Sequence, residues 1–463
     1  MQYSASNATL WNSIVQFGII SCALLVATLL RRKLPFVRQS LLPTSVLAGF
    51  LLLLARNTGV LHLDTIFLET LTYHGIAVGF IAMSLRVPRQ RSAAERSAMT
   101  GAKSGALIVS CYLVQALIGL AISFALSYTV MPGLFKASGI LLPMGYGQGP
   151  GQANNIGTSY EALGFTGGRS FGLSLAAAGY LCACVVGVLY LNLLRRRGLI
   201  RTSTQPCAQD AVTVDDFQDC GEIPVAESID RFSMQVVMVL AVYLATYLVS
   251  WGVDAGLSVI APGLGATLSP ILWGFNFIVG SLMAIGLRSL FTGLKKTRIM
   301  TRQYQNNYLL SRISGVAFDL MIVAGIASIN IEDLSGLWVP FLLMAAAGGI
   351  VTLLYLQRVC RRIYPDYYYE GLTSMYGMLT GTISSGVLLL RELDPGFETP
   401  AANNLVLGSG FGIAFGAPML LLIGMAPKSD ASTWLVFGLA AVYLALLLLF
   451  LCKAGKTKNK QED

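Results

Sequence analysis

The sequence predicts an all-α polytopic membrane protein made of two inverted-topology repeats. Its 463 residues are 55% hydrophobic and only 12% charged, and soluble domains usually carry about twice that charged share. Apolar runs long enough to span a bilayer recur along the whole chain. Two polar, glycine-rich segments interrupt these runs at corresponding places in the two halves, at 145–157 and 376–386.

The apolar runs form a set of five followed by a set of six. The first set is 12–30, 41–57, 70–85, 104–130 and 171–194. The second set is 233–252, 267–287, 312–330, 336–359, 402–424 and 433–452. We expect about five transmembrane helices in each repeat, and the run at 433–452 is then an extra C-terminal helix.

Basic residues concentrate in every second loop, as at 31–33, 195–197 and 453–460. The alternate loops hold only Arg56, Lys136 and Lys428. This asymmetry predicts an N-terminus outside and a C-terminus in the cytoplasm of a multi-pass inner-membrane protein. It also explains the net charge of +9 without nucleic acid as a partner.

The two polar segments are related by an offset of 230 positions. That shift places Tyr146, Gly147 and Gly151 on Tyr376, Gly377 and Gly381. Because the charge pattern makes the segments enter from opposite sides, we expect inverted repeats, each with a reentrant or broken hairpin. The predicted divisions are a repeat at 1–197 with reentrant segment 140–165, a polar cytoplasmic linker at 198–231, a second repeat at 232–430 with reentrant segment 371–395, and a helix with a basic tail at 431–463.

The first segment is rich in amides and the second in hydroxyls, and glycine permits a positive φ and a close approach to a ligand. In secondary transporters, such interruptions mark the binding site, where helix N-termini attract carboxylates and free carbonyls coordinate Na⁺. Alternatively, the two segments are tight turns and helix-packing faces that bind no ligand. The predicted substrate- or ion-binding residues are Gly147, Gln148, Gly149, Gly151, Gln152, Asn154, Asn155, Thr380, Gly381, Thr382, Ser384, Ser385, Asp319 and Arg391.

Two charged residues complete this set. Asp319 is the only acidic residue well inside a predicted span, and intramembrane carboxylates usually serve ion or proton pathways. The alternative is a paired or hydrated carboxylate near the cytoplasmic end. Arg391 follows the second segment and would suit an acidic substrate; alternatively, it marks the aqueous end of a hairpin.

In these features the chain resembles the bacterial sodium/glutamate symporters, as a divergent member. The resemblance rests on Pro43 at the start of the second span, on Gly164-Phe165-Thr166, and on the two glycine-rich segments. Alternating glycines stand at Gly145, Gly147, Gly149 and Gly151, and the second segment offers Gly377, Gly381, Thr382, Arg391, Glu392 and Pro395. Where the family commonly has a histidine in the first segment, this chain has Tyr146 and Gln148, and its second segment has fewer glycines.

The resemblance implies Na⁺-coupled symport of glutamate or a similar small carboxylate by an elevator-like movement, in a homodimer within the bilayer. Na⁺ is then the coupling ion, possible at the backbone of the two hairpins, and no other cofactor is expected. Alternatives are a carrier for another amino acid or dicarboxylate coupled to Na⁺ or H⁺, a channel, or a membrane-embedded enzyme. We expect no enzyme, because His62 and His74 stand without an acidic cluster and no phosphate-binding nucleotide motif occurs.

Overall fold

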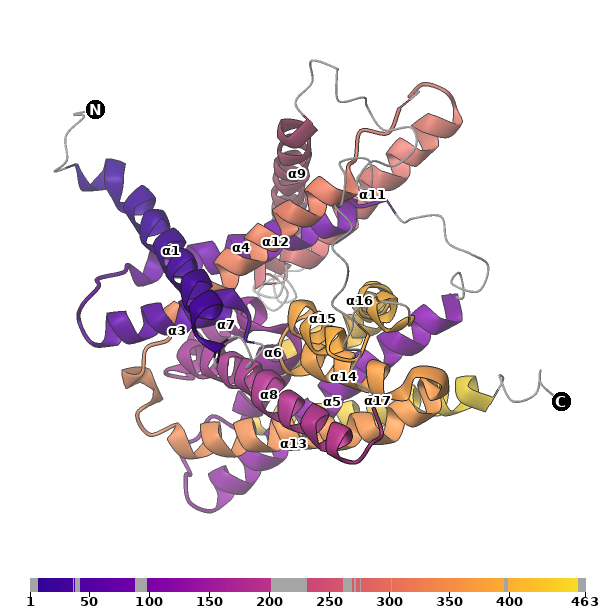
Figure 1. Cartoon of the computed structure of the whole chain (residues 1–463). Coiled ribbons are helices and arrows are strands. Elements are labelled where there is room, and N and C mark those ends of the chain that lie inside the picture. The colour runs from indigo at the N-terminus through magenta and orange to yellow at the C-terminus, as the bar shows by residue number, and fades with distance from the viewer. Residues whose placement is uncertain are drawn as a thin grey trace. The chain divides into compact units, whose positions relative to one another are not determined.

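The computed structural model describes residues 7–35, 37, 42–87, 98–200, 231–260, 269, 272–274, 276–300, 302–394 and 399–456. Its elements in these ranges are α-helices and short 3-10 helices (Figure 1). The chain divides into two compact units. The first comprises residues 1–69, 92–206 and 323–463, and the second comprises 70–91 and 207–322.

The first unit holds most of the helices and both polar segments. Its elements are α1 (Ala8–Lys33), α3 (Thr44–Asn57), the start of α4 (Thr65–Leu85), α5 (Ala98–Tyr128), η1 (Lys136–Ile140), α6 (Leu141–Gln148), α7 (Pro150–Glu161), α8 (Gly168–Arg196), the end of α12 (Asn307–Ala327), η3 (Glu332–Leu334), α13 (Trp338–Ile363), η4 (Pro365–Tyr367), α14 (Tyr368–Thr380), α15 (Ile383–Arg391), α16 (Ala401–Met425), η5 (Ala426–Lys428) and α17 (Asp430–Lys456).

Four helices with bounds in the described residues belong to the second unit. It contains the rest of α4, α9 (Arg231–Ile260), α11 (Asn276–Lys296) and α12 up to Ile322. Its core includes Ile81, Val239, Ala284 and Leu310, one from each helix. Both units therefore have an apolar core of their own.

Ten of the described helices are long and apolar enough to cross a membrane, and α3 is a shorter apolar helix. Their outer faces remain apolar. On α17, Leu435, Leu439, Val442, Leu446 and Leu449 are all exposed, and their spacing of three to four residues puts them on one side of the helix. An exposed stripe of this kind is costly in water and favourable in lipid. The chain is a multi-pass, membrane-embedded protein.

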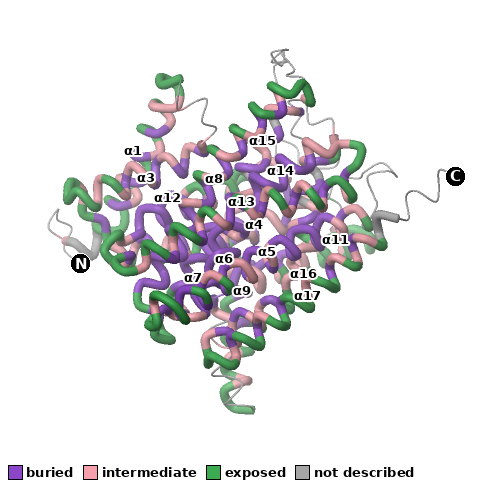
Figure 2. The backbone as a smooth tube through the Cα atoms, turned by 90° about the horizontal axis from the view of Figure 1, so that it is seen from below, coloured by how far each residue is buried: buried purple, intermediate pink, exposed green. Residues whose placement is uncertain are grey.

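The core of the first unit surrounds the polar segments. Buried residues run along α5 and α6 (Figure 2). A large apolar cluster joins Leu107 of α5, Leu191 of α8, Leu356 of α13 and Tyr376 of α14. Tyr376, Met378 and Leu379 of this cluster belong to the second polar segment, so the cluster packs against that segment.

The predicted spans agree with the observed helices in order and type, and the differences lie at the ends. Each of the eleven apolar runs corresponds to a helix, including the extra run at 433–452, which lies within α17. Helix α9 continues to Ile260 and α11 to Lys296, beyond the apolar runs that predict them. Within the predicted linker, residues 201–230 lie outside the described residues. The predicted repeat boundaries stay a prediction, because the compact units follow packing and not sequence order.

Candidate functional site

The first polar segment is helical except at one residue. Helix α6 ends at Gln148, α7 begins at Pro150, and Gly149 between them has φ +83° and ψ −173°. Residues that have a Cβ rarely adopt this backbone conformation. Pro150 suits the first position of α7, because an N–H there would have no partner within the helix. Within this segment, the helix is therefore interrupted at Gly149 alone.

The second polar segment breaks at two residues. Helix α14 ends at Thr380 and α15 begins at Ile383; between them Gly381 has φ −139° and ψ −105°, and Thr382 is extended. The two helices fold against each other, since an ideal Cβ on Gly377 would lie 2.8 Å from Cα of Gly386. Gly381 has a negative φ, so the close approach of Ser385, and not a positive φ, is what calls for glycine at this position.

The two breaks lie against each other in the first unit. An ideal Cβ on Gly149 would be 3.7 Å from Cγ2 of Thr382 and 3.8 Å from the carbonyl oxygen of Gly381. Glycines on α8 permit this approach. An ideal Cβ on Gly172 would be 2.9 Å from the Ala153 carbonyl oxygen, and one on Gly179 would collide with the Thr380 carbonyl. Helix α8 thus supports both breaks with its backbone.

Two residues beside the breaks were not among the predicted site residues. Gln115 of α5 is 1% exposed, and its Nε2 donates to the Leu379 carbonyl and to Thr352 Oγ1, both at 2.9 Å. Its Oε1 would be 3.2 Å from a Cβ on Gly147. Tyr180 of α8 lies beside Gly149 and Gly381. The sequence could have indicated Gln115 as a site residue, because it is an amide in the middle of the apolar run 104–130.

Several polar atoms around the breaks are buried without a hydrogen-bond partner among the described residues. They include Oε1 and Nε2 of Gln152, Oδ1 of Asn154, Oγ1 of Thr382, Oγ of Ser385 and Oε1 of Gln115. Gln152 is 1% exposed and Ser385 is 2% exposed. A buried polar group without a partner costs about 1–3 kcal/mol, so such groups are rare unless a ligand or water completes them. We call these five residues, with Gly149 and Gly381, the break site.

Not every predicted residue contributes its side chain. The Thr380 hydroxyl donates to the Tyr376 carbonyl of its own helix at 2.8 Å. Gly147, Gly151 and Asn155 are buried in α6 and α7, and Gln148 is half-buried. The side chains of Ser384 and Arg391 lie outside the described residues. Asp319 is exposed on α12 within the second unit, so its participation stays a prediction.

The break site combines two kinds of electrostatic environment. Helices α7 and α15 begin at the breaks, and the first N–H groups of a helix are unpaired within it and attract anions. Helices α6 and α14 end at the same place, where carbonyl groups and the negative end of the helix dipole favour cations. The arrangement can therefore hold an anion and a cation next to each other.

The chain was also compared with known proteins. No protein-family model matches this sequence, and no curated protein is significantly similar to it.

Proposed function

We propose that this protein is a secondary active transporter that carries a small carboxylate, glutamate first, together with Na⁺ across the inner membrane. The observation that carries this proposal is the meeting of two helix breaks with buried amide and hydroxyl groups that lack partners. Irregular backbone at membrane depth is tolerated only inside protein or beside a polar cavity. Such breaks are where secondary transporters bind solute and coupling ion.

The helix bounds support the proposed internal repeat. A shift of 230 positions moves α6 from 141–148 to 371–378, within α14, and moves α7 from 150–161 to 380–391, over α15. The same shift moves α8 from 168–196 to 398–426, over α16 at 401–425. Together with the alternating basic loops, this order favours two repeats of opposite orientation, with the N-terminus outside and the C-terminus in the cytoplasm.

The chemistry of the break site favours an anionic solute with a cation. The first turns of α7 and α15 offer N–H groups, and no acidic residue occurs in 145–157 or 376–386. A carboxylate alone would be costly in this buried place, and Na⁺ at the neighbouring carbonyl groups would offset its charge. Resemblance to the sodium/glutamate symporters supports the same assignment, with hairpins moving as part of an elevator in a homodimer.

The test is uptake into proteoliposomes with an imposed Na⁺ gradient. The panel is L-glutamate, D-glutamate, aspartate, citrate and a neutral amino acid, each with Na⁺, with a proton gradient and with neither. We expect saturable, Na⁺-dependent accumulation of an acidic solute that is recovered unchanged. Uptake only of a neutral or cationic solute, without Na⁺ dependence, would contradict the proposal; a chemically altered solute would indicate an enzyme.

A further inference from the structure

Gln115 is a buried amide in α5, outside both polar segments. It is 1% exposed, and its Nε2 donates to the Leu379 carbonyl and to Thr352 Oγ1, both at 2.9 Å. A carbonyl oxygen can only accept a hydrogen bond, so the NH2 group must face Leu379 and the orientation of the amide is fixed. The atom left over is therefore the acceptor Oε1, which is buried without a donor among the described residues.

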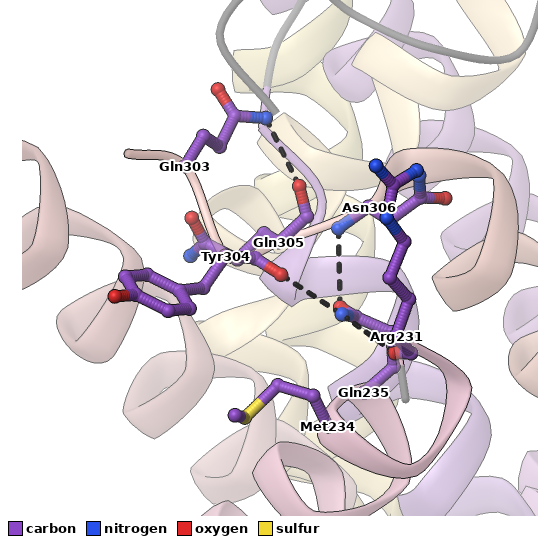
Figure 3. A pocket seen from close by; sticks show the side chains of 7 residues that line it. All are labelled: Arg231, Met234, Gln235, Gln303, Tyr304, Gln305 and Asn306. Carbon is purple, nitrogen blue, oxygen red and sulfur yellow. Dashed lines mark hydrogen bonds between the residues drawn. The ribbon is translucent and has the colours of Figure 1, made fainter. Parts of the chain in front are cut away.

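A second buried amide shows how a glutamine with a structural role is paired. Gln235 of α9 is also 1% exposed; its Nε2 donates to the Tyr304 carbonyl at 2.9 Å, and its Oε1 accepts from the Asn306 N–H at 3.1 Å. These bonds tie α9 to the 303–306 loop (Figure 3). Both ends of the Gln235 amide hold the fold together, whereas in Gln115 only the NH2 group does so.

The Gln115 side chain lies where two helices end. Its Nε2 holds the carbonyl of Leu379 in α14, and its Oε1 would be 3.2 Å from a Cβ on Gly147 in α6. Each of these two residues stands two positions before the break that follows it. Helix α14 has no capping backbone N–H among the described residues. Both helices thus bring carbonyl groups and the negative end of the helix dipole to Gln115.

The break site therefore has two sides. Gln152 and Asn154 lie in α7, which begins at the first break. Thr382 is the N-cap of α15, and Ser385 lies in the first turn of that helix. These four residues belong to the helix starts, which attract anions. Gln115 alone contacts the helices that end at the breaks, and a neutral carbonyl oxygen at such ends suits a hard cation.

We propose that Gln115 binds the coupling cation through Oε1, so that the cation lies on the α5 side of the break site and the carboxylate on the side of α7 and α15. This inference rests on the proposed Na⁺-coupled symport and assigns a side chain to its cation. The surroundings of Oε1 are tight, since a Cβ on Gly147 would collide with the ring of Tyr112. We expect this place to take the small cations Na⁺ and Li⁺ in preference to K⁺.

Thermal unfolding of the full-length protein in detergent tests the inference. The midpoint is measured against NaCl, LiCl and KCl, with and without L-glutamate, at an ionic strength held constant with N-methyl-D-glucamine chloride. The wild type should be stabilised by Na⁺ or Li⁺ more than by K⁺. Gln115→Met keeps the side-chain length and removes the amide, and it should raise the Na⁺ concentration for half-maximal stabilisation at least about tenfold, because a contact with a charge is lost.

Three further variants separate cation binding from a structural role. Thr352→Val removes one acceptor of Gln115 Nε2 and leaves Oε1 in place, and Gln235→Leu removes the paired amide of the second unit. Both should lower the midpoint without Na⁺ and keep the half-maximal Na⁺ concentration within about twofold. Gln115→Glu, which keeps an oxygen ligand but loses the NH2 donor, should bind Na⁺ more tightly than Gln115→Met.

The outcomes distinguish this inference from the proposed function. A Na⁺ response of Gln115→Met equal to that of the wild type, or an equal loss in Thr352→Val, overturns the inference and leaves the proposed function standing. A wild type without any Na⁺-specific rise also overturns the inference, and uptake into proteoliposomes then decides the proposed function separately. If the Na⁺ response depends on Gln115 but no acidic solute is taken up, the cation site stands and the proposed substrate is wrong.

Discussion

Two polar regions of the first unit differ in how their buried groups are paired. In the break site, Gln152, Thr382 and Ser385 have atoms without partners among the described residues. The second region, which we call the Asp333 network, consists of Ser170, Asn330, Asp333, Arg169 and Glu69.

In the Asp333 network, both carboxylate oxygens of Asp333 accept hydrogen bonds. Ser170 Oγ donates to Asp333 Oδ2 at 2.9 Å, Asn330 Nδ2 donates to Asp333 Oδ1 at 3.0 Å, and Arg169 forms an ion pair with Glu69. Satisfied polar groups stabilise a fold, whereas unsatisfied ones lower its stability until something binds them. Under the proposed function, the first region serves binding and the second serves structure, so mutations in the two regions should act on different measurements.

The largest effect is expected at Gly149. Gly149→Val forces a branched side chain into a backbone conformation with φ +83°, at a cost on the order of 1–3 kcal/mol, and inserts methyl groups between the two breaks. We expect uptake to be abolished while the protein still reaches the membrane. Uptake per correctly folded protein is the measurement.

Gly164→Val is the matched control for backbone strain. Gly164 also has a positive φ, +100°, but an ideal Cβ there would meet nothing within 4 Å. This variant should lose some stability and keep its uptake. If both variants transport normally, or both fail equally, the breaks are not specifically required.

The next effect is expected at Gln152, whose side chain is buried with neither Oε1 nor Nε2 paired among the described residues. Gln152→Leu should leave the ligand-free protein as stable or more stable, by about 1 kcal/mol, because an unsatisfied group is removed. Uptake should fall at least about tenfold, and the thermal stabilisation by solute and Na⁺ should fall with it.

Gln16→Leu is the matched control, because it removes a buried amide that is hydrogen-bonded. Gln16 is 3% exposed, but its Nε2 donates to Asn12 Oδ1 and its Oε1 accepts from the Asp64 N–H, both at 2.9 Å. Its replacement should lower the unfolding midpoint and leave solute affinity unchanged. A loss of ligand-free stability in Gln152→Leu as large as in Gln16→Leu would argue against a ligand-binding role of the Gln152 amide.

A smaller effect on function is expected in the Asp333 network. Asp333→Ala leaves Ser170 and Asn330 without their shared acceptor, which should lower the free energy of unfolding by about 2 kcal/mol. Solute affinity and Na⁺ dependence should stay within about twofold, since the Asp333 carboxylate is already paired without a ligand. Thermal unfolding and uptake are measured on the same preparation. If Asp333→Ala keeps its thermal unfolding midpoint but loses the Na⁺ dependence of uptake, the coupling site lies in this network.

The sequence predicted the positions of the helices better than it predicted which side-chain atoms of the site remain unpaired. Apolar length alone identifies the helices, because a span needs a long apolar run wherever it packs. The positions of both breaks followed from glycines in polar surroundings. Which side chains remain unpaired depends on neighbours far along the chain. Gln115 contacts the Leu379 carbonyl across 264 positions, and Thr380 turns its hydroxyl to its own helix. The Gln115 contact is not encoded in local composition, whereas the Thr380 contact is a local bond to the residue four positions earlier.

Asp319 is a predicted site residue that belongs to neither the break site nor the Asp333 network. It is exposed on α12 in the second unit, and an ionised carboxylate facing lipid would be costly. We therefore expect the carboxylate to keep a polar environment, and its charge to influence cation coupling. Asp319→Asn keeps the size and removes the charge, so the unfolding free energy should change by less than about 0.5 kcal/mol.

The Na⁺ dependence of uptake is the decisive measurement for Asp319. We expect Asp319→Asn to raise the Na⁺ concentration for half-maximal uptake several-fold, because a negative charge that favours cation entry is lost. Glu332→Gln removes an exposed carboxylate outside the spans and should leave this concentration unchanged. If the two variants behave alike, Asp319 has no part in coupling, and the binding chemistry is confined to the break site of the first unit.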